Sequence, residues 1–203
     1  MALNELTMGT KLVLFSVVYF VAVIVMAHFF AQPGYEWTQN TISELASQGH
    51  RYKRIMQAGF IGFGLLLSGG LVLKSIRAKG IHYPDILLGL YGLAIIVTGF
   101  FCEKPIAATI SYSVKEASIH SAFATVAGIS LSLGMLGYLL MAAMPSERVF
   151  HAVFLALVVG FSMLFGLTEN ETIGIGKGIV QRGLYLVSFV WLLVGQWFGF
   201  GSI

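Results

Sequence analysis

The sequence is poor in charged residues, and this shortage sets its class. Only 10% of its 203 residues are charged, whereas 57% are hydrophobic. Soluble domains carry about 25% charged residues. A soluble fold could not bury this much apolar surface, but a lipid bilayer accepts it. The formal net charge of +3 is small and scattered, which excludes nucleic acid as the expected partner.

Cysteine is nearly absent, and long polar stretches are missing altogether. Cys102 is the only cysteine, so an intrachain disulfide is excluded, and we expect a buried, unreactive thiol. Because no polar stretch is long enough to fold by itself, we expect residues 1–203 to form a single transmembrane domain. No nucleotide-binding motif accompanies the glycine-rich residues 173–178, and we expect no cofactor.

The sequence instead contains six long apolar runs. About 20 apolar residues cross a bilayer as a helix, and only helices and closed barrels satisfy backbone polar groups in lipid. The runs lack the alternation of barrel strands. We therefore predict an all-α, polytopic, six-helix transmembrane bundle. The predicted spans are about 12–31, 55–73, 84–102, 117–141, 150–168 and 178–200. No cleavage site follows the first run, so we expect it to be retained.

The longest connection, residues 32–54, carries signals of its own. Thr41 and Glu44 fit the two ends of a capping box, which predicts a short helix over about 42–48 lying at the membrane interface. Tyr35 and Trp37 are expected to anchor it at headgroup depth.

Six spans place both termini on one side of the membrane. That side carries five basic residues and the other carries seven. The cluster Lys74, Arg77 and Lys79 has no acidic neighbours, whereas the basic residues opposite are interleaved with carboxylates. We therefore favour cytoplasmic termini in a multi-pass protein of a plasma membrane.

Most acidic groups gather at the end of the spans away from the termini. Ionisable groups near hydrocarbon are costly and usually functional, so we expect the site at this end. The groups concerned are Glu36, Glu44, Glu103, Glu116, Glu169, Glu171, His28, His50, His120, Gln181 and Arg182. His82 and His151 lie at the opposite end, where we expect them to be solvated.

Two short pairs supply the candidate catalytic residues. Glu116 and His120 are four residues apart and share a helix face. They form either a simple hydrogen-bonded pair or a proton shuttle or metal-ligand pair. Ser43 and Glu44 are either part of the capping box or a nucleophile and an acid; no nucleophile-elbow motif surrounds Ser43. The catalytic candidates are therefore His120, Glu116, Ser43 and Glu44.

Gln181 and Arg182 open the last span, where Arg182 needs a partner. An ion pair with Glu116, Glu103, Glu44 or Glu169 is one interpretation. A clamp for a lipid phosphate or carboxylate is the other. The expected ligand-binding residues are Arg182, Gln181, Glu103, Glu116, His120 and Glu44. We expect no metal; if one binds, its ligands would be His28, His50 and His120.

Small residues recur in several spans and favour close helix packing within the chain. They include Gly59, Gly62, Gly64, Gly69, Gly70, Ala122, Gly128, Gly134 and Gly137. Gly195 and Gly199 form a G-x-x-x-G motif, which leaves a homodimer through the last span as an alternative.

Four of these motifs together carry a resemblance. They are residues 40–45 (Asn-Thr-Ile-Ser-Glu-Leu), residues 100–103 (Phe-Phe-Cys-Glu), His120, and Gln181 with Arg182. With them the chain resembles the prokaryotic six-helix membrane family called domain of unknown function 998, whose layout is similar to the Frag1/DRAM/Sfk1 proteins. The resemblance covers nearly the whole chain. It implies six spans with cytoplasmic termini and no established activity. The family's Phe-Pro-x-Asp-like turn is replaced here by Phe101, Cys102 and Glu103.

Three functions remain open from the sequence. The first is binding or handling of a membrane lipid or other amphiphile in a polar cavity that faces the outer leaflet. The second is a metal-assisted intramembrane hydrolase or transferase acting on a lipid. The third is a small proton-coupled transporter, which the lack of a visible internal repeat disfavours. Whether the protein is an enzyme is left undecided.

Overall fold

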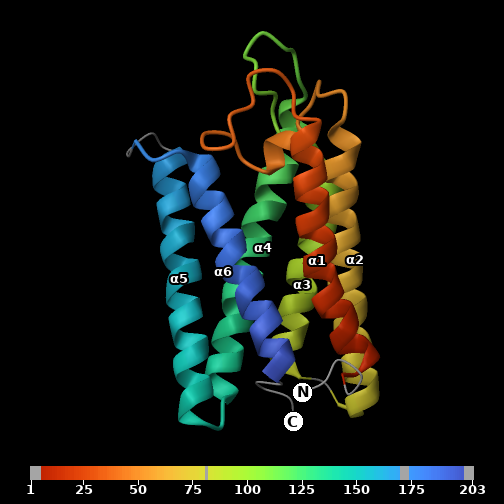
Figure 1. Ribbon diagram of the computed structural model, residues 1–203, viewed down its shortest axis with the longest axis vertical. Helices are drawn as coiled ribbons and strands as arrows, with labels where there is room; N and C mark the ends of the chain where they lie inside the picture. The colour runs from red at the N-terminus through yellow and green to blue at the C-terminus, as the bar shows by residue number, and fades with distance from the viewer. Residues whose placement is uncertain (1–5, 81, 170–173, 199–203) are drawn as a thin grey trace.

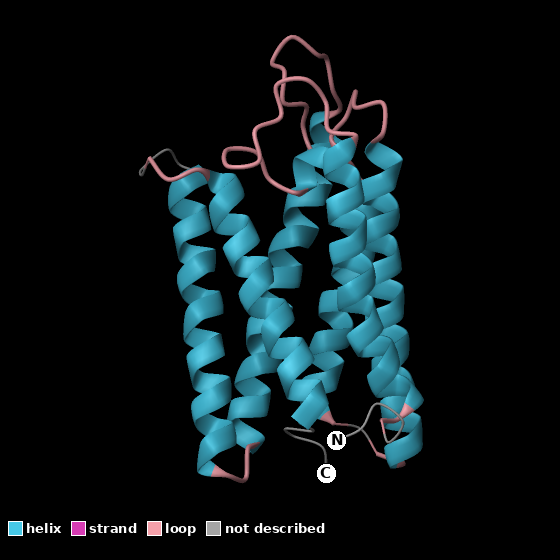
Figure 2. Ribbon diagram, viewed as in Figure 1, coloured by secondary structure: helices cyan, strands magenta, loops and turns pink. Residues whose placement is uncertain are grey.

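The computed structural model describes residues 6–80, 82–169 and 174–198. In these residues the chain is helical, with no β-strand (Figure 2). This confirms the predicted all-α class. Each of the six α-helices is long and apolar enough to cross a membrane, as a multi-pass membrane protein requires. The helices are α1 Met8–Phe29, α2 Lys53–Ala78, α3 Tyr83–Phe100, α4 Val114–Met141, α5 Pro145–Glu169 and α6 Lys177–Phe198.

The six helices run alternately up and down along one bundle axis (Figure 1). The start of α1 and the end of α6 lie together at one end of the bundle, here called the terminal end. The opposite end, here called the loop end, carries the two longest connections, residues 30–52 and 101–113 (Figure 1). Acidic and histidine side chains predicted to gather away from the termini therefore lie at the loop end.

Caps explain why several helices begin before their apolar runs. The Thr7 side chain accepts a hydrogen bond from the Thr10 amide at 3.1 Å and starts α1. The Ser113 hydroxyl accepts from the Glu116 amide at 3.2 Å and starts α4 three residues ahead of the predicted span. Such caps satisfy amides that have no partner inside the helix. Helix α2 ends where Lys79 adopts a left-handed conformation, with φ of 52°.

Glycines set the close packing of the first helices. A Cβ atom on Gly70 of α2 would lie 2.8 Å from the carbonyl oxygen of Gly9 in α1. A Cβ on Gly64 would collide with the carbonyl of Gly92 in α3. This supports the predicted intrachain role of the small residues. Gly69 and Gly128, by contrast, meet nothing within 4 Å.

The proposed dimer contact through α6 stays a prediction. Gly195 is buried, and a Cβ atom there would meet the Phe150 ring of α5 at 3.9 Å. Its motif partner, Gly199, lies outside the described residues, as do Glu171 and the side chain of Glu169.

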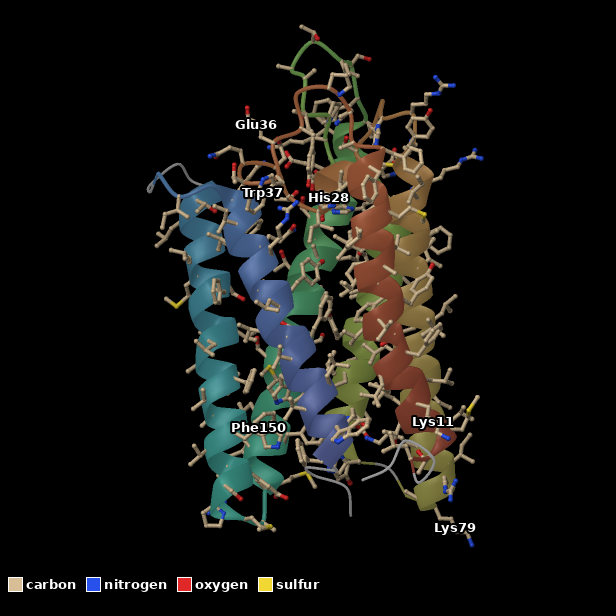
Figure 3. All side chains as sticks on the ribbon, viewed as in Figure 1. Lys11, His28, Glu36, Trp37, Lys79 and Phe150 are labelled. Atoms are coloured by element: carbon tan, nitrogen blue, oxygen red, sulfur yellow. The ribbon has the colours of Figure 1, made fainter. Side chains whose placement is uncertain are left out.

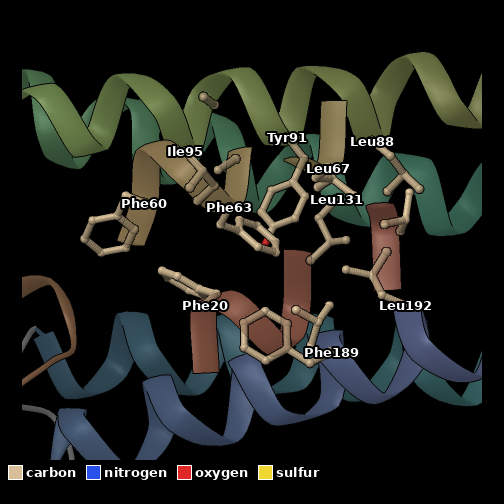
Figure 4. Packing of buried hydrophobic residues seen from close by; sticks show 14 of the residues in the cluster. Phe20, Phe60, Phe63, Leu67, Leu88, Tyr91, Ile95, Leu131, Phe189 and Leu192 are labelled. Atoms are coloured by element: carbon tan, nitrogen blue, oxygen red, sulfur yellow. The ribbon is translucent and has the colours of Figure 1, made fainter. Parts of the chain in front are cut away.

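An aromatic core joins α1, α2 and α6 at mid-height. Phe20 stacks on Phe63 with ring centroids 4.9 Å apart, and Phe189 lies 5.8 Å from both rings (Figure 4). Helix α5 lies outside this core, at the edge of the bundle, and packs mainly on α4 and α6.

Candidate functional site

The connection after α1 folds back over the bundle and docks on the start of α6. The Ile179 amide donates to the Thr38 carbonyl at 3.1 Å, and the Ile42 amide donates to Gln181 Oε1 at 2.6 Å. A Cβ atom on Gly178 would collide with the carbonyls of Trp37 and Asn40. The glycine-rich stretch before α6 therefore allows backbone to lie against backbone.

Glu44 is the anchor of this connection. Its Oε2 accepts from the Thr41 amide at 2.6 Å, while the Glu44 amide donates to the Thr41 hydroxyl at 3.2 Å. The reciprocal bonds are those of the predicted capping box. The helix they start is a single 3₁₀ turn, η2 Ser43–Ala46, whose side chains are buried. Lys177 of α6 donates to Glu44 Oε1 at 2.8 Å, so both carboxylate oxygens are bonded.

Arg182 does not form the predicted ion pair. Its Nη1 donates to the carbonyls of Asn40 and Gly178, both at 2.9 Å. Its Nη2 donates to the Tyr35 hydroxyl at 2.6 Å and to His28 Nε2 at 2.8 Å. Within the described residues no carboxylate oxygen lies within 4 Å of the guanidinium. Of the four predicted partners, Glu116, Glu103 and Glu44 are wrong because the first turn of α6 faces the folded connection, and the side chain of Glu169 lies outside the described residues.

Arg182 is thus a hub that fixes α1, the connection and α6 at the loop end. Figure 3 shows His28 and Trp37 at this end, and the Trp37 ring centroid lies 5.9 Å from the guanidinium carbon. His28 Nδ1 lies 2.7 Å from the Ile24 carbonyl, which can only accept, so Nε2 is left to accept from Arg182. Burial raises the pKa of Tyr35, and the guanidinium partly opposes that rise.

His120 lies at the centre of the loop end and is 1% exposed. Its Nδ1 is 2.8 Å from the Phe101 carbonyl and 3.0 Å from the Thr98 carbonyl. Its Nε2 lies 3.7 Å from Glu103 Oε2 and has no hydrogen-bond partner in the described part of the chain. A buried polar atom without a partner is rare and costly, which marks this nitrogen for explanation.

Glu116 is not the partner of His120, although the two are one turn apart. Glu116 Oε1 instead accepts from the Cys102 amide at 2.9 Å and holds the chain as it leaves α3. The i, i+4 spacing would allow a contact between Glu116 and His120, but the Glu116 carboxylate accepts from the Cys102 backbone amide instead. Cys102 is a free, buried thiol, and burial raises its pKa.

A cavity of about 970 Å³ opens beside His120. Its polar end is formed by Glu44, Glu103, Lys104, His120, Lys177 and Gln181. Its deeper walls are mainly apolar and come from α2 to α6, including Phe60, Leu131, Val158, Met163 and Leu184. Tyr91 and Tyr185 line the same interior. Ligand pockets commonly have this size and this mixture of apolar walls with few polar groups.

The cavity opens on the flank of the bundle between α4 and α5. Ser121, Ala124 and Thr125 of α4 line the cavity and are also exposed on the surface. On the facing helix α5, Met163 also lines the cavity and is 68% exposed. Residues that are both lining and exposed mark the opening, and they also include Lys104, Tyr112 and Val114 at the loop end. The cavity therefore opens both at the loop end and toward the side of the bundle that spanning helices would turn to lipid.

The structure separates the predicted site residues into two groups. Glu44, Glu103, His120, Gln181 and Ser43 line the cavity. The residues Arg182, Glu116, His28 and His50 do not. The three histidines suggested as metal ligands are not brought together: across residues 6–80, 82–169 and 174–198, no three His, Cys, Asp or Glu side chains form a group that could hold a metal ion.

Sequence reasoning missed Lys104, Lys177 and the two tyrosines of the cavity. Lys177 lies within the glycine-rich residues 173–178 and is one of the seven basic residues on the side of the membrane away from the termini. Tyr91 and Tyr185 lie within apolar runs, where a single aromatic residue gives no signal beyond core packing.

The terminal end holds a second buried polar cluster. Asp85 of α3 accepts a short hydrogen bond from the Tyr138 hydroxyl of α4, and its Oδ2 lies 3.5 Å from Lys74 Nζ of α2. Lys74 also donates to Gln196 Oε1 of α6 at 3.1 Å. Four helices are joined by these contacts. His82 Nδ1 lies 3.8 Å from Asp85, and burial lowers the pKa of His82 while Asp85 opposes that shift.

The two histidines of the terminal end are not solvated, contrary to expectation. His151 is 1% exposed, and its Nδ1 accepts from Trp191 Nε1 at 3.0 Å. His82 has 14% of its side chain exposed and packs on the Tyr138 ring. His151 is enclosed by the rings of Tyr138 and Trp191, and His82 by Tyr138 and Asp85, whereas the apolar runs alone suggested helix ends open to water.

The chain belongs to the family described as protein of unknown function (DUF998), whose sequence profile matches residues 14–197. The match covers all six helices, which confirms the family suggested by the motifs. No curated protein and no solved structure matches the chain.

Proposed function

We propose that this DUF998 protein binds or handles a membrane lipid or another amphiphile in the cavity beside His120. The observation that carries the proposal is the cavity itself, about 970 Å³, polar at the loop end and mainly apolar along its depth. An amphiphile has the same division between a polar headgroup and an apolar tail. The opening between α4 and α5 gives such a molecule a route from the bilayer that keeps its tail out of water.

We further propose that the loop end faces away from the cytoplasm of a prokaryotic cell and that both termini are cytoplasmic. The exposed Arg77 and Lys79 at the terminal end support this orientation, whereas Lys74, the third residue of the predicted cluster, is paired with Asp85. Phosphatase and fluorescent-protein fusions to the C-terminus test it. We expect fluorescence without phosphatase activity; active phosphatase would place the cavity on the cytoplasmic side.

The test of the proposed function is to fill the cavity from its wall. A Cβ atom on Gly128 of α4 meets nothing within 4 Å, and Gly128 lines the cavity. We expect Gly128→Leu to lower the amount of lipid that co-purifies with the protein, as measured by native mass spectrometry. Gly160→Leu on α5 is the matched control, because Gly160 is also in open space but does not line the cavity. Equal lipid content in both variants would contradict the proposal.

One observation favours a second candidate, a lipid hydrolase or transferase. The unpartnered Nε2 of His120 beside Glu103 is an arrangement that could activate water, with or without a metal. Elemental analysis of protein purified without chelators tests the metal form of this function. About one zinc per chain, lost in His120→Ala, would favour the hydrolase over the binding protein; we expect no such stoichiometric metal.

A further inference from the structure

His120 is held in one tautomer by its surroundings. Its Nδ1 faces two backbone carbonyl oxygens, of Phe101 and Thr98, and carbonyl oxygens only accept hydrogen bonds. Nδ1 must therefore carry a proton. In the neutral ring the other nitrogen, Nε2, then presents a lone pair. The Nε2 atom has almost no accessible surface and no donor among the described residues, and His120 is one of the residues that line the cavity.

Glu103 presents a second acceptor to the same point. Its Oε1 accepts from the Lys104 amide at 2.9 Å, which leaves Oε2 facing His120 Nε2 at 3.7 Å. That separation is too long for a direct hydrogen bond. Two acceptors turned toward one another need a donor between them, which either a proton on the imidazole or a bound donor group supplies, and the carboxylate adds a preference for positive charge.

The basic groups nearby are mostly engaged and do not form an anion clamp. Arg182 donates to four neutral acceptors of the scaffold and is not part of the cavity wall. Lys177 is bonded to Glu44 at 2.8 Å. Lys104 alone is an exposed basic residue at the cavity rim, next to Glu103 in the chain.

We propose that His120 and Glu103 bind the primary ammonium group of an amine-bearing amphiphile, with Lys104 at the rim next to its phosphate where the headgroup is zwitterionic. The ammonium supplies donors for both Nε2 and Oε2 and a charge that complements Glu103. This inference rests on the proposed function, because it assigns a headgroup class to the same cavity. It replaces the sequence-based expectation that Arg182 meets an anionic headgroup.

The test compares lipids that differ only in donors on the headgroup nitrogen. Phosphatidylethanolamine and phosphatidylcholine with identical acyl chains carry the same net charge, but the choline nitrogen has no N–H. Binding to the purified full-length protein in maltoside micelles is measured by native mass spectrometry. We expect phosphatidylethanolamine to bind about tenfold more tightly, the ratio that one charge-assisted hydrogen bond can give. Its monomethyl and dimethyl derivatives should fall in between.

Glu103→Gln should remove most of this preference, whereas Glu36→Gln should keep it. Glu36 is an exposed carboxylate at the same end and does not line the cavity, so it controls for the lost charge (Figure 3). Equal binding of both lipids, or a preference that survives in Glu103→Gln, would overturn the inference.

The outcomes separate the two proposals. If both lipids bind equally and Gly128→Leu weakens both, the cavity holds an amphiphile but the ammonium inference is wrong. If Gly128→Leu changes neither, the proposed function itself fails. Free phosphoethanolamine at millimolar concentration should not displace the lipid; displacement would show that a soluble amine is the ligand and would overturn the lipid assignment.

Discussion

The two ends of the bundle both contain buried carboxylates and histidines, but they use them differently. At the terminal end, Asp85 is met by Tyr138 and Lys74, and Lys74 is in turn bonded to Gln196. At the loop end, His120 Nε2 and Glu103 Oε2 face each other across 3.7 Å with no donor between them. At the terminal end His82 Nδ1, 3.8 Å from Asp85 Oδ2, also has no hydrogen-bond partner among the described residues, but the chain supplies partners for the Asp85 carboxylate, and this cluster does not line the cavity. A carboxylate whose oxygens are met by groups of the chain stabilises the fold. A cluster with unused acceptors beside a cavity has capacity for a ligand.

The largest expected loss of stability is for a substitution at the terminal end. Asp85→Asn leaves the Lys74 ammonium without its nearby carboxylate in a largely buried site. Removing one member of a buried ion pair costs about 3 kcal/mol. We expect thermal melting in detergent to show a destabilisation of this order. Arg77→Gln, which removes a charge from an exposed position of the same end, is the control and should melt like the wild type.

A smaller loss of stability is expected for a substitution at the point where the connection after α1 docks on α6. Gly178→Ala places a methyl group against the carbonyls of Trp37 and Asn40, and such overpacking costs about 1–3 kcal/mol. Gly174→Ala is the matched control, since a Cβ atom there meets nothing within 4 Å. Faster hydrogen exchange of residues 37–42 in Gly178→Ala alone would confirm the docking; identical exchange in both variants would contradict it.

Removing the hydrogen bonds of Arg182 should lower the stability by a similar or slightly smaller amount. Arg182→Gln removes donors from Tyr35, His28 and two carbonyls, and a buried acceptor left without its donor costs about 1–3 kcal/mol. Because the partners are neutral, a second Glu116→Gln change should not restore the lost stability. Restoration would instead revive the ion pair predicted from the sequence. Arg54→Gln, on the exposed surface of the same end, controls for the lost charge.

The smallest change in stability is expected for Glu103→Gln. Among the described residues no Lys or Arg side chain is paired with Glu103, and His120 Nε2 lies beyond hydrogen-bond distance at 3.7 Å, so the charge of Glu103 contributes little to the fold. We expect the melting free energy to change by less than about 0.5 kcal/mol, the range of ordinary surface substitutions. A loss as large as that of Asp85→Asn would mean that the loop-end pair is structural, and the contrast between the two ends would disappear.

Much of the fold could be predicted from the sequence because lipid restricts it so strongly. Uninterrupted apolar runs admit only helices in a bilayer, so the six spans and the all-α class follow directly. The bonds between Thr41 and Glu44 also follow, since a capping box joins residues three apart in the chain.

The partners of the site residues could not be predicted, because they depend on helix rotation and on how a 23-residue connection folds. Arg182 meets the backbone of residue 40 rather than a carboxylate because the connection crosses the start of α6. The Asp85 cluster draws one residue from each of four helices, and no spacing in the sequence links them. Local rules state which contacts are possible, whereas tertiary packing selects among them.

The most direct test of the central claim is to locate a bound lipid tail. A phosphatidylethanolamine with a diazirine near the end of one acyl chain is incorporated into proteoliposomes, photolysed, and mapped by peptide mass spectrometry. We predict that labelling concentrates on residues 121–133 of α4 and 158–166 of α5, and that Gly128→Leu abolishes it. Labelling spread evenly over lipid-facing surfaces such as Val18, Val21 and Val25 of α1, and unchanged by Gly128→Leu, would contradict the account.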